Sequence, residues 1–327
     1  MSLPGRWVCT AALLTCAALV PASRGASATQ AAPPAPVLPA IADDDVLAIQ
    51  VRLDRAGFSP GEIDGRAGAN TRKALSAFQR ARELQPSGRT SDAATVAALR
   101  AEGEAVPIAP YVITDADLAG PFVPMIPGDL MEQATLPALA YTSVLEMLSE
   151  RFHASPQLLQ QLNPSATFAT VGESLVVPNV TQPPGESSGS REITVIVSRD
   201  GSALGVRSPN DEVVFHAPVT TGSEVDPLPL GNWTVTTVSR DPPFHYNPDL
   251  FWDADPSHAK ATIAPGPNNP VGVVWIDLSR KHYGLHGTPE PRLVGRTESH
   301  GCVRMTNWDA LRVASMVAKG TPVRFVE

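Results

Sequence analysis

A cysteine and a histidine near the C-terminal end of the chain have the residue types and the spacing for nucleophilic chemistry. His286 opens the run His286-Gly287-Thr288, and Cys302 follows within Ser299-His300-Gly301-Cys302-Val303-Arg304. A thiol is a weak nucleophile until it is ionised, and an imidazole within hydrogen-bond reach can remove its proton. The pair therefore predicts acyl transfer, with Cys302 as the nucleophile and His286 as the general base.

Neighbouring residues are suited to supporting roles in such a reaction. Gly301 permits a close approach of the backbone, and the amides of Gly301 and Cys302 can donate to a developing oxyanion. His300 and Ser299 are candidates to support this loop or the oxyanion site. Arg304 has a planar guanidinium that suits a substrate carboxylate.

The same residues have three other interpretations. Arg304 can instead pair with an acidic neighbour. His286, His300 and Cys302 have the ligand types of a zinc site, but neither an H-E-x-x-H motif nor a CxxC pair accompanies them, so we expect no metal. A lone cysteine is also commonly a small buried hydrophobe.

The arrangement resembles the active-site signature of the YkuD-like L,D-transpeptidase family, over about Ile193 to Val326. Tyr283-Gly284-Leu285 and Met305 fit this signature, whereas Leu228 stands where the family usually has Thr. The resemblance implies that the carbonyl of Gly287 holds the ring nitrogen of His286 that faces away from the sulfur. It also implies that the enzyme needs no cofactor.

The resemblance further implies a reaction on the stem peptides of peptidoglycan. Cys302 would attack the carbonyl of the third stem residue, meso-diaminopimelate, and expel D-Ala from a tetrapeptide. Transfer of the thioester to the side-chain amine of another stem would give a 3→3 cross-link. Water as acceptor would make the protein an L,D-carboxypeptidase, and a protein amine would make it a protein-to-peptidoglycan ligase. A non-catalytic wall-binding adaptor is a further alternative, which the intact Cys302 and His286 pair disfavours.

Residues 191–327 must position this chemistry, and their pattern predicts a mostly β domain. Ile193, Val195 and Val197 alternate with less apolar positions, and Asp200-Gly201 marks a hairpin turn. Thr306 and Asp309 predict the capped start of a final helix. We predict further strands at residues 213–215, 233–238 and 271–276, and we interpret the aromatic connection 241–270 as a lid over a cleft.

Within residues 43–102, apolar residues recur at helical spacing in three stretches, which predicts three helices. Asp44 or Asp45 is a candidate cap of the first helix, Asn70 or Thr71 of the second, and Asp92 of the third. The turn glycines, Asp64 and two glutamines resemble the helical peptidoglycan-binding domain of cell-wall enzymes. A generic three-helix bundle with solvated glutamines is the alternative.

Residues 136–180 combine two helical stretches with a short final strand at Leu175-Val176-Val177. They resemble a degenerate LysM module, a strand–helix–helix–strand fold that binds N-acetylglucosamine-containing glycans, although Tyr141-Thr142-Ser143 replaces its usual opening signature. A structural spacer is the alternative. Residues 103–135 remain an unassigned linker. Residues 181–190, rich in Pro, Gly and Ser, predict a flexible linker that leaves the orientation of the modules free.

The N-terminal residues predict export. Arg6 precedes an apolar run and then Ala26-Ser27-Ala28, so we predict a signal peptide over residues 1–28 and a Pro- and Ala-rich linker over 29–42. A lipoprotein signal at Cys16 is the alternative. Cleavage would remove Cys9 and Cys16, which leaves Cys302 as the only thiol of an exported protein, in the periplasm or associated with the wall.

Composition limits the partners. The chain has 327 residues, 25 Lys+Arg and 33 Asp+Glu, with a formal net charge of −8, and it lacks the clustered basic stripe of nucleic-acid-binding proteins. No stretch after the signal approaches the length of a membrane span. We therefore expect a multidomain α+β protein that binds peptidoglycan stem peptides and glycan, with no nucleic acid partner and no integral membrane segment.

Overall fold

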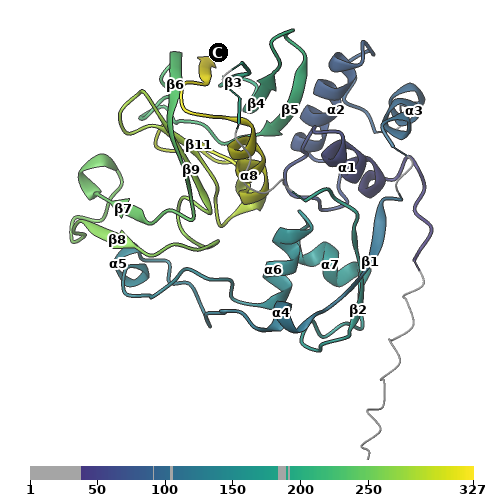
Figure 1. Cartoon of the computed structure of the whole chain (residues 1–327), viewed down its shortest axis with the longest axis horizontal. Coiled ribbons are helices and arrows are strands. Elements are labelled where there is room, and N and C mark those ends of the chain that lie inside the picture. The colour runs from purple at the N-terminus through teal and green to yellow at the C-terminus, as the bar shows by residue number, and fades with distance from the viewer. Residues whose placement is uncertain (1–37, 91, 104–105, 183–188, 191) are drawn as a thin grey trace, which may run out of the picture. The chain divides into compact units, whose positions relative to one another are not determined.

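The computed structural model describes residues 38–90, 92–103, 106–182, 189–190 and 192–327, all within one compact unit, Pro33–Glu327 (Figure 1). The predicted signal peptide (1–28) lies outside these residues, as do most of the linker 29–42 and most of the linker 181–190. Within the described ranges, no helix is both long and apolar enough to cross a bilayer.

Three helices form the N-terminal part: α1 (Val46–Arg55), α2 (Ala69–Ala81) and α3 (Ala93–Ala101). Asp45 caps α1 and Asp92 caps α3, as the sequence predicted. The predicted cap of α2 is wrong, because Gly68 precedes its first turn without a side-chain hydrogen bond. The side chain of Asn70 donates instead to the carbonyl of Val294, 2.9 Å away.

The two glutamines of this part are buried rather than solvated. Gln50 donates to Asp64 at 2.9 Å and accepts from the amide of Gly65 at 2.8 Å. Gln79 donates to Thr95 at 2.8 Å. These amides tie the turns to the helices, because a buried polar side chain must find partners inside the protein. The helices close over an apolar core formed by Ile49, Leu53, Phe58, Ala74, Leu75, Phe78 and Leu99.

Residues 108–178 contain a strand–helix–helix–strand unit. Its strands β1 (Ile108–Val112) and β2 (Ser174–Pro178) pair antiparallel, and α6 (Val144–Arg151) and α7 (Pro156–Leu162) lie between them in the chain. The first strand therefore lies in the segment that the sequence left unassigned, and not beside Tyr141. Two short helices, α4 (Asp115–Leu118) and α5 (Leu130–Gln133), occupy the connection to α6.

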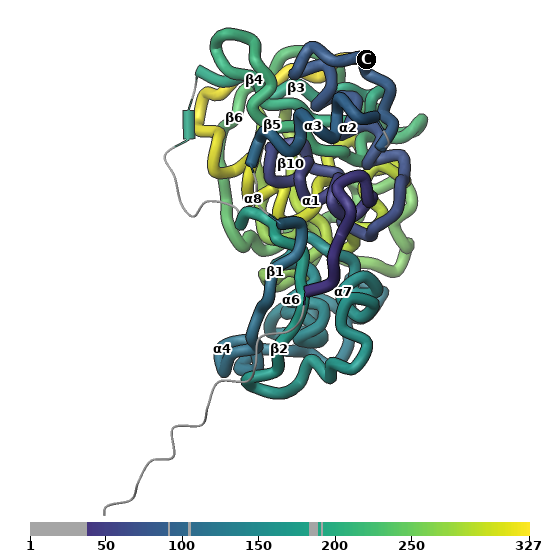
Figure 2. The backbone as a smooth tube through the Cα atoms, turned by 90° about the vertical axis from the view of Figure 1, so that its right-hand side faces the viewer, coloured from purple at the N-terminus to yellow at the C-terminus, as the bar shows by residue number. Residues whose placement is uncertain are grey.

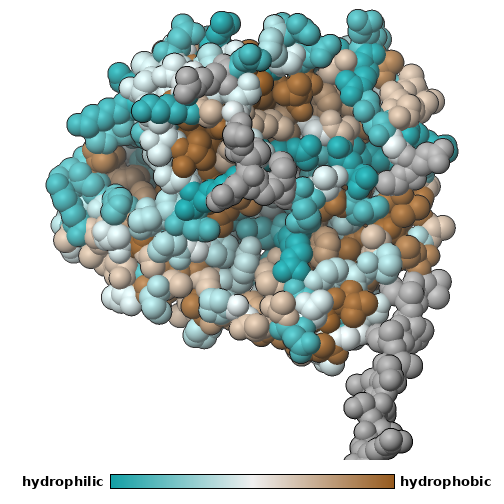
Figure 3. All heavy atoms as spheres, in the orientation of Figure 1, coloured by the Kyte–Doolittle hydropathy of each residue, from teal (hydrophilic) through white to brown (hydrophobic). Residues whose placement is uncertain are grey.

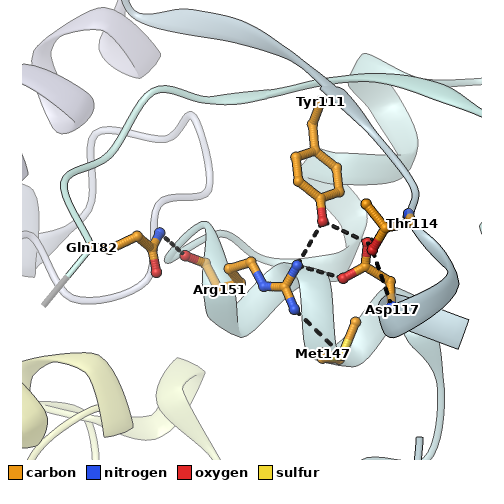
Figure 4. Close-up of polar contacts among 6 residues, drawn as sticks. All are labelled: Tyr111, Thr114, Asp117, Met147, Arg151 and Gln182. Carbon is orange, nitrogen blue, oxygen red and sulfur yellow. Dashed lines mark hydrogen bonds and ion pairs between the residues drawn. The ribbon is translucent and has the colours of Figure 1, made fainter. Parts of the chain in front are cut away.

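An ion pair with shared hydrogen bonds holds α4, β1 and α6 together (Figure 4). Arg151 donates to Asp117 at 2.5 Å and to the hydroxyl of Tyr111 at 2.7 Å. Tyr111 and Thr114 both donate to the same carboxylate. The pKa of Asp117 falls well below its usual range, because these hydrogen bonds together outweigh the effect of burial.

The C-terminal part is an eight-stranded curled sheet with the strand order β11-β10-β9-β6-β12-β3-β4-β5. The main chain of Thr220, just beyond β5, bonds to Arg304 of β11, so the two ends of this strand order meet. The sheet is mixed, since β12 pairs parallel with β3 and β10 parallel with β11. Its strands are β3 (Thr194–Ser198), β4 (Ala203–Arg207), β5 (Val213–Pro218), β6 (Gly231–Arg240), β9 (Val274–Leu278), β10 (Gly284–His286), β11 (Val303–Arg304) and β12 (Pro322–Val326).

The connection 241–270 has a small core of its own. It forms the hairpin of β7 (Phe244–Tyr246) and β8 (Ala261–Ile263), with the short helix η1 (Pro248–Leu250) between them. Tyr246 and Ile263 pack with Leu139, and side chains from residues 126–136 surround them. Some of its aromatic side chains therefore pack against the segment that contains α5.

The first turn of α8 (Asn307–Met316) joins the three parts of the unit. Asn307 donates to Glu150 at 3.0 Å. Trp308 stacks on His153, with ring centroids 5.1 Å apart. Ser59 donates to Asp309 at 3.0 Å. These buried contacts fix the helical and strand–helix–helix–strand parts against the sheet, in contrast to the free orientation that we expected from the linker.

The buried carboxyl of Asp309 should make the free energy of unfolding depend on pH. Burial raises its pKa to about 7, so the folded protein retains a proton that the unfolded chain releases near pH 4. Stability should therefore decrease as pH rises from about 4 to 7. Asp309→Asn should flatten this decrease and gain on the order of 1–3 kcal/mol at pH 8, as measured by urea unfolding.

The control is Asp44→Asn at an exposed position, which should follow the parent at every pH. Parallel pH curves for Asp309→Asn and the parent protein would show that Asp309 is not protonated in the fold.

Candidate functional site

The sheet brings the two predicted catalytic residues to one of its faces. Strands β10 and β11 are parallel neighbours, with Leu285 opposite Val303 and His286 opposite Arg304. Because side chains alternate along a strand, Cys302, His286 and Arg304 lie on the same face. The sequence predicted these residues, and the pairing of their strands explains how segments separated by a long loop come together.

His286 is held by a main-chain acceptor. Its Nδ1 lies 2.6 Å from the carbonyl oxygen of Gly287, and its ring stacks on Trp275 with centroids 5.5 Å apart. Because a carbonyl can only accept, Nδ1 carries the proton and Nε2 keeps its lone pair. Burial, and then the charge of Arg304, lower the pKa of His286 to about 3, so the ring is neutral at pH 7.

Asn307 packs against the acceptor of His286. A side chain at Gly287 would place its Cβ 2.1 Å from Oδ1 of Asn307, and one at Gly272 would place its Cβ 2.0 Å from the same atom. Oδ1 also accepts from the amide of Val273 at 3.2 Å. The side-chain amide of Asn307 thus lies between two chain segments, and this close approach is possible only because both segments have a glycine there. Sequence reasoning missed this residue, because its function depends on contacts distant in the chain.

Cys302 is partly exposed, and its thiol donates to the carbonyl of His282 at 3.7 Å. Among the described residues, no hydrogen bond joins the thiol to the ring of His286. Burial raises the pKa of the thiol, whereas a backbone hydrogen bond with Gly284 and the charge of Arg304 oppose this effect. The resting site therefore holds a neutral thiol and a neutral imidazole.

The conformation of the loop before Cys302 requires particular residues. Gly301 has φ +91°, and a Cβ there would lie 2.5 Å from Cε1 of Tyr283, so only glycine fits. Ser299 is buried, and its hydroxyl donates to the carbonyl of Cys302 at 2.6 Å. Ser299 therefore supports the loop.

His300 points to the connection 241–270 and not to the thiol. Its Nε2 lies 2.7 Å from Asp253, and its ring contacts Phe251 and Trp252. Its Nδ1 is buried and has no hydrogen-bond partner among the described residues. His300 thus joins the cysteine loop to this connection, and Asp253 is a partner that the sequence did not indicate.

Arg304 is a half-buried cation without a carboxylate partner. Its main-chain amide and carbonyl both bond to Thr220, at 2.9 and 3.0 Å. Its guanidinium forms no ion pair with any described residue, so the alternative that it only pairs with an acidic neighbour is not observed. Burial lowers its pKa, and the negative charges of Glu290 and Asp253 act in the opposite direction. Such a cation can receive an anionic group from a ligand.

Comparison with known proteins identifies two families in the chain. Residues 192–325 match the family model of the L,D-transpeptidase catalytic domain (YkuD), and residues 42–99 match that of a peptidoglycan-binding domain. The family protein YkuD of Bacillus licheniformis is 30% identical over 181 residues, which cover 55% of this chain and 91% of that protein.

Two further comparisons cover similar shares of the chain. YbiS of Escherichia coli is 26% identical over 184 residues, which cover 55% of this chain and 56% of that protein. The solved structure of an L,D-transpeptidase from Mycobacterium smegmatis is 19% identical, covers 48% of this chain and 65% of that chain, and has a TM-score of 0.34. By its match to YkuD over nearly the whole of that relative, the chain belongs to the YkuD family of L,D-transpeptidases.

Proposed function

We propose that the protein is an exported L,D-transpeptidase that forms 3→3 cross-links in peptidoglycan through a thioester on Cys302. The observation that carries the proposal is the bond from Nδ1 of His286 to the carbonyl of Gly287, because it leaves Nε2 as a base. Cys302 and Arg304 share the face of the sheet on which this ring lies.

In the first half-reaction, the thiol proton passes to Nε2 of His286 as the sulfur attacks the carbonyl of the third stem residue. The amides of Gly301 and Cys302 donate to the resulting oxyanion. Collapse of the tetrahedral intermediate breaks the peptide bond, and the imidazolium gives its proton to the departing amine of D-Ala. Arg304 binds a carboxylate of the donor stem.

In the second half-reaction, the side-chain amine of another stem attacks the thioester. Its proton passes to His286 and then to the departing sulfur, which restores the neutral pair. Burial makes a thiolate on Cys302 and an imidazolium on His286 costly in the free site. The thiol therefore loses its proton while the bond from sulfur to carbon forms, and not beforehand. The contact between the thiol and the imidazole then tightens only when substrate is bound, as is common in catalytic sites.

The helical part and the strand–helix–helix–strand part are proposed to hold the wall polymer. The first matches a peptidoglycan-binding domain. The second has a cavity of about 580 Å³ between its first connection and the segment after α7, lined by Phe122, Thr142, Ser143, Gln160, Thr167 and Phe168. This cavity is our candidate LysM-like glycan site.

Two other acyl acceptors would use the same thioester. Water would give an L,D-carboxypeptidase, and a protein amine would give a protein-to-peptidoglycan ligase. Incubation of residues 29–327 with purified muropeptides, followed by mass spectrometry, distinguishes dimers from tripeptide products and from protein adducts. A non-catalytic adaptor would leave every muropeptide unchanged.

Cys302→Ala should abolish turnover, because the nucleophilic sulfur is lost. His286→Gln should slow acylation by about 10²–10⁴-fold, since it removes the general base. The measurement is the rate of thioester formation by quenched intact-mass spectrometry. Lys319→Gln, on an exposed turn, is the control and should acylate like the parent. Equal acylation by His286→Gln and the parent would remove His286 from this role.

Arg304→Gln should slow alkylation of Cys302 by iodoacetamide at pH 7. Arg304 lowers the pKa of the thiol, so its removal should raise that pKa and shift the alkylation profile to higher pH. Arg324→Gln, exposed on β12, serves as the control with the same change of charge. An unshifted profile in Arg304→Gln would mean that the guanidinium does not act on the sulfur.

A further inference from the structure

A cavity of about 1100 Å³ lies between α2 and the outer face of strands β3, β4 and β5. Figures 1 and 2 both show α2 beside β5. The alternation of the strands sends Val195, Leu204 and Phe215 into the core. The intervening positions face outward, and three of those that line the cavity are small, so they leave space below the helix: Ser198, Ala203 and Gly205. Cys302, His286 and Arg304 are not among its lining residues.

Helix α2 lines this cavity with three cations. Arg72, Ser76 and Arg80 follow one another at the i, i+4, i+8 spacing of one helix face, and Lys73 lies beside them. Among the described residues, none of the three cations has an ion-pair partner, and Arg72 donates only to the carbonyl of Ala67 at 2.9 Å. Partial burial lowers the pKa of Lys73. Arg72 and Arg80 are exposed and Lys73 is half-buried, and three cations on one helix face create a positive potential that favours an anionic ligand.

The sheet adds an unpartnered histidine to the same cavity. His216 of β5 lines it with only 9% of its surface exposed, and its Nδ1 has no hydrogen-bond partner among the described residues. Its ring stacks on Phe58, which fixes its orientation. Burial, followed by the charges of Arg80 and Lys73, lowers its pKa to about 4, so it is neutral at pH 7. A buried nitrogen without a partner costs free energy that a ligand can offset.

The charges of the cavity are mixed, which selects the class of ligand. Arg82 also lines it but bonds to Glu102, and Arg207 pairs with Asp211. Glu83 and Glu212 line it as well, and neither has an ion pair within the described part of the chain. These carboxylates would repel a uniform polyanion, whereas they suit a ligand that carries an amine beside its carboxylates. On the face of the molecule that Figure 3 shows, hydrophobic residues form small groups among hydrophilic ones.

We propose that this cavity binds a peptide that carries carboxylates as well as a free amine, at a site separate from Cys302. Its identification as a peptidoglycan stem peptide rests on the proposed function. The three cations hold the carboxylates, and Glu83 or Glu212 holds the amine. The helical part and the sheet each supply half of the site, so a stem that is not reacting would be held across both.

The test uses residues 29–327 labelled with ¹⁵N-histidine and the synthetic tetrapeptide L-Ala-γ-D-Glu-meso-diaminopimelate-D-Ala as probe. The ring resonances of His216, assigned from His216→Gln, should shift with saturation at pH 7. Arg80→Glu and Lys73→Glu should each weaken the affinity read at His216 by about tenfold or more, which is about 1.4 kcal/mol. Lys319→Glu carries the same charge change outside the cavity and should bind like the parent, and urea midpoints verify that each variant folds.

Two additional probes test the class of ligand. The tetrapeptide with an acetylated amine should bind at least several-fold more weakly at His216. An oligomer of glycerol phosphate should bind more weakly than the tetrapeptide, and tighter binding of this oligomer would replace the proposal with a polyanion site. Unshifted His216 resonances at a saturating tetrapeptide concentration, or an unchanged affinity of Arg80→Glu, would overturn it.

This result is independent of the catalytic proposal. Cys302→Ala should retain the His216 response, because the sulfur is not part of the cavity. In the parent protein, an absence of cross-linking with the His216 response intact would contradict the proposed function alone, and cross-linking without a His216 response would contradict the cavity proposal alone.

Discussion

The amide of Asn307 fits between two segments of main chain only because residues 272 and 287 have no side chain. That fit holds the carbonyl that accepts from His286, and it places the first turn of α8 directly against strand β10. The same amide donates to Glu150 at 3.0 Å and to the carbonyl of Pro267 at 3.1 Å. The orientation of the His286 ring therefore depends on packing contributed by several distant segments.

The consecutive residues of that turn also explain why the parts of the unit form one body. Asn307, Trp308 and Asp309 each contact a different residue outside the sheet, and all three are buried. Burial raises the pKa of Glu150, which contacts α8, and of Asp309, within α8, to about 7, so both carboxyls resist ionisation. A protonated carboxyl avoids the free-energy cost of a buried charge. Polar side chains can therefore lie in the packed interface between α8 and the other parts.

The electrostatics of the site favour a resting state without charge on the thiol or on the imidazole. Burial raises the pKa of Cys302 and lowers that of His286, so separating the charges would be costly in the free protein. Arg304 has no carboxylate partner and lies opposite His286 in the strand register. An anionic group that pairs with Arg304 would weaken its effect on the pKa of both the thiol and the imidazole.

The sequence alone determined the local features of this protein. Asp45, Asp92 and Thr306 cap helices as predicted, because a cap depends on residues only a few positions apart. The Val195 and Val197 alternation predicted a buried strand face, and the predicted strands at residues 213–215 and 233–238 are present within β5 and β6. The types and order of the cysteine, histidine and arginine also indicated the chemistry, since reactivity begins with the functional group.

Only the tertiary structure decided the contacts between distant segments. Strand β1 was missed because its partner β2 is distant in the sequence and its own pattern includes Pro110. His300 binds Asp253, and the cap of α2 is lost because Asn70 bonds to Val294; neither partner is near in sequence. Strand pairing brings Cys302 and His286 to one face, and the packing of Asn307 against two glycines fixes the acceptor of the ring. These features depend on which surfaces bury one another, and a periodic pattern within one segment carries no information about its partner.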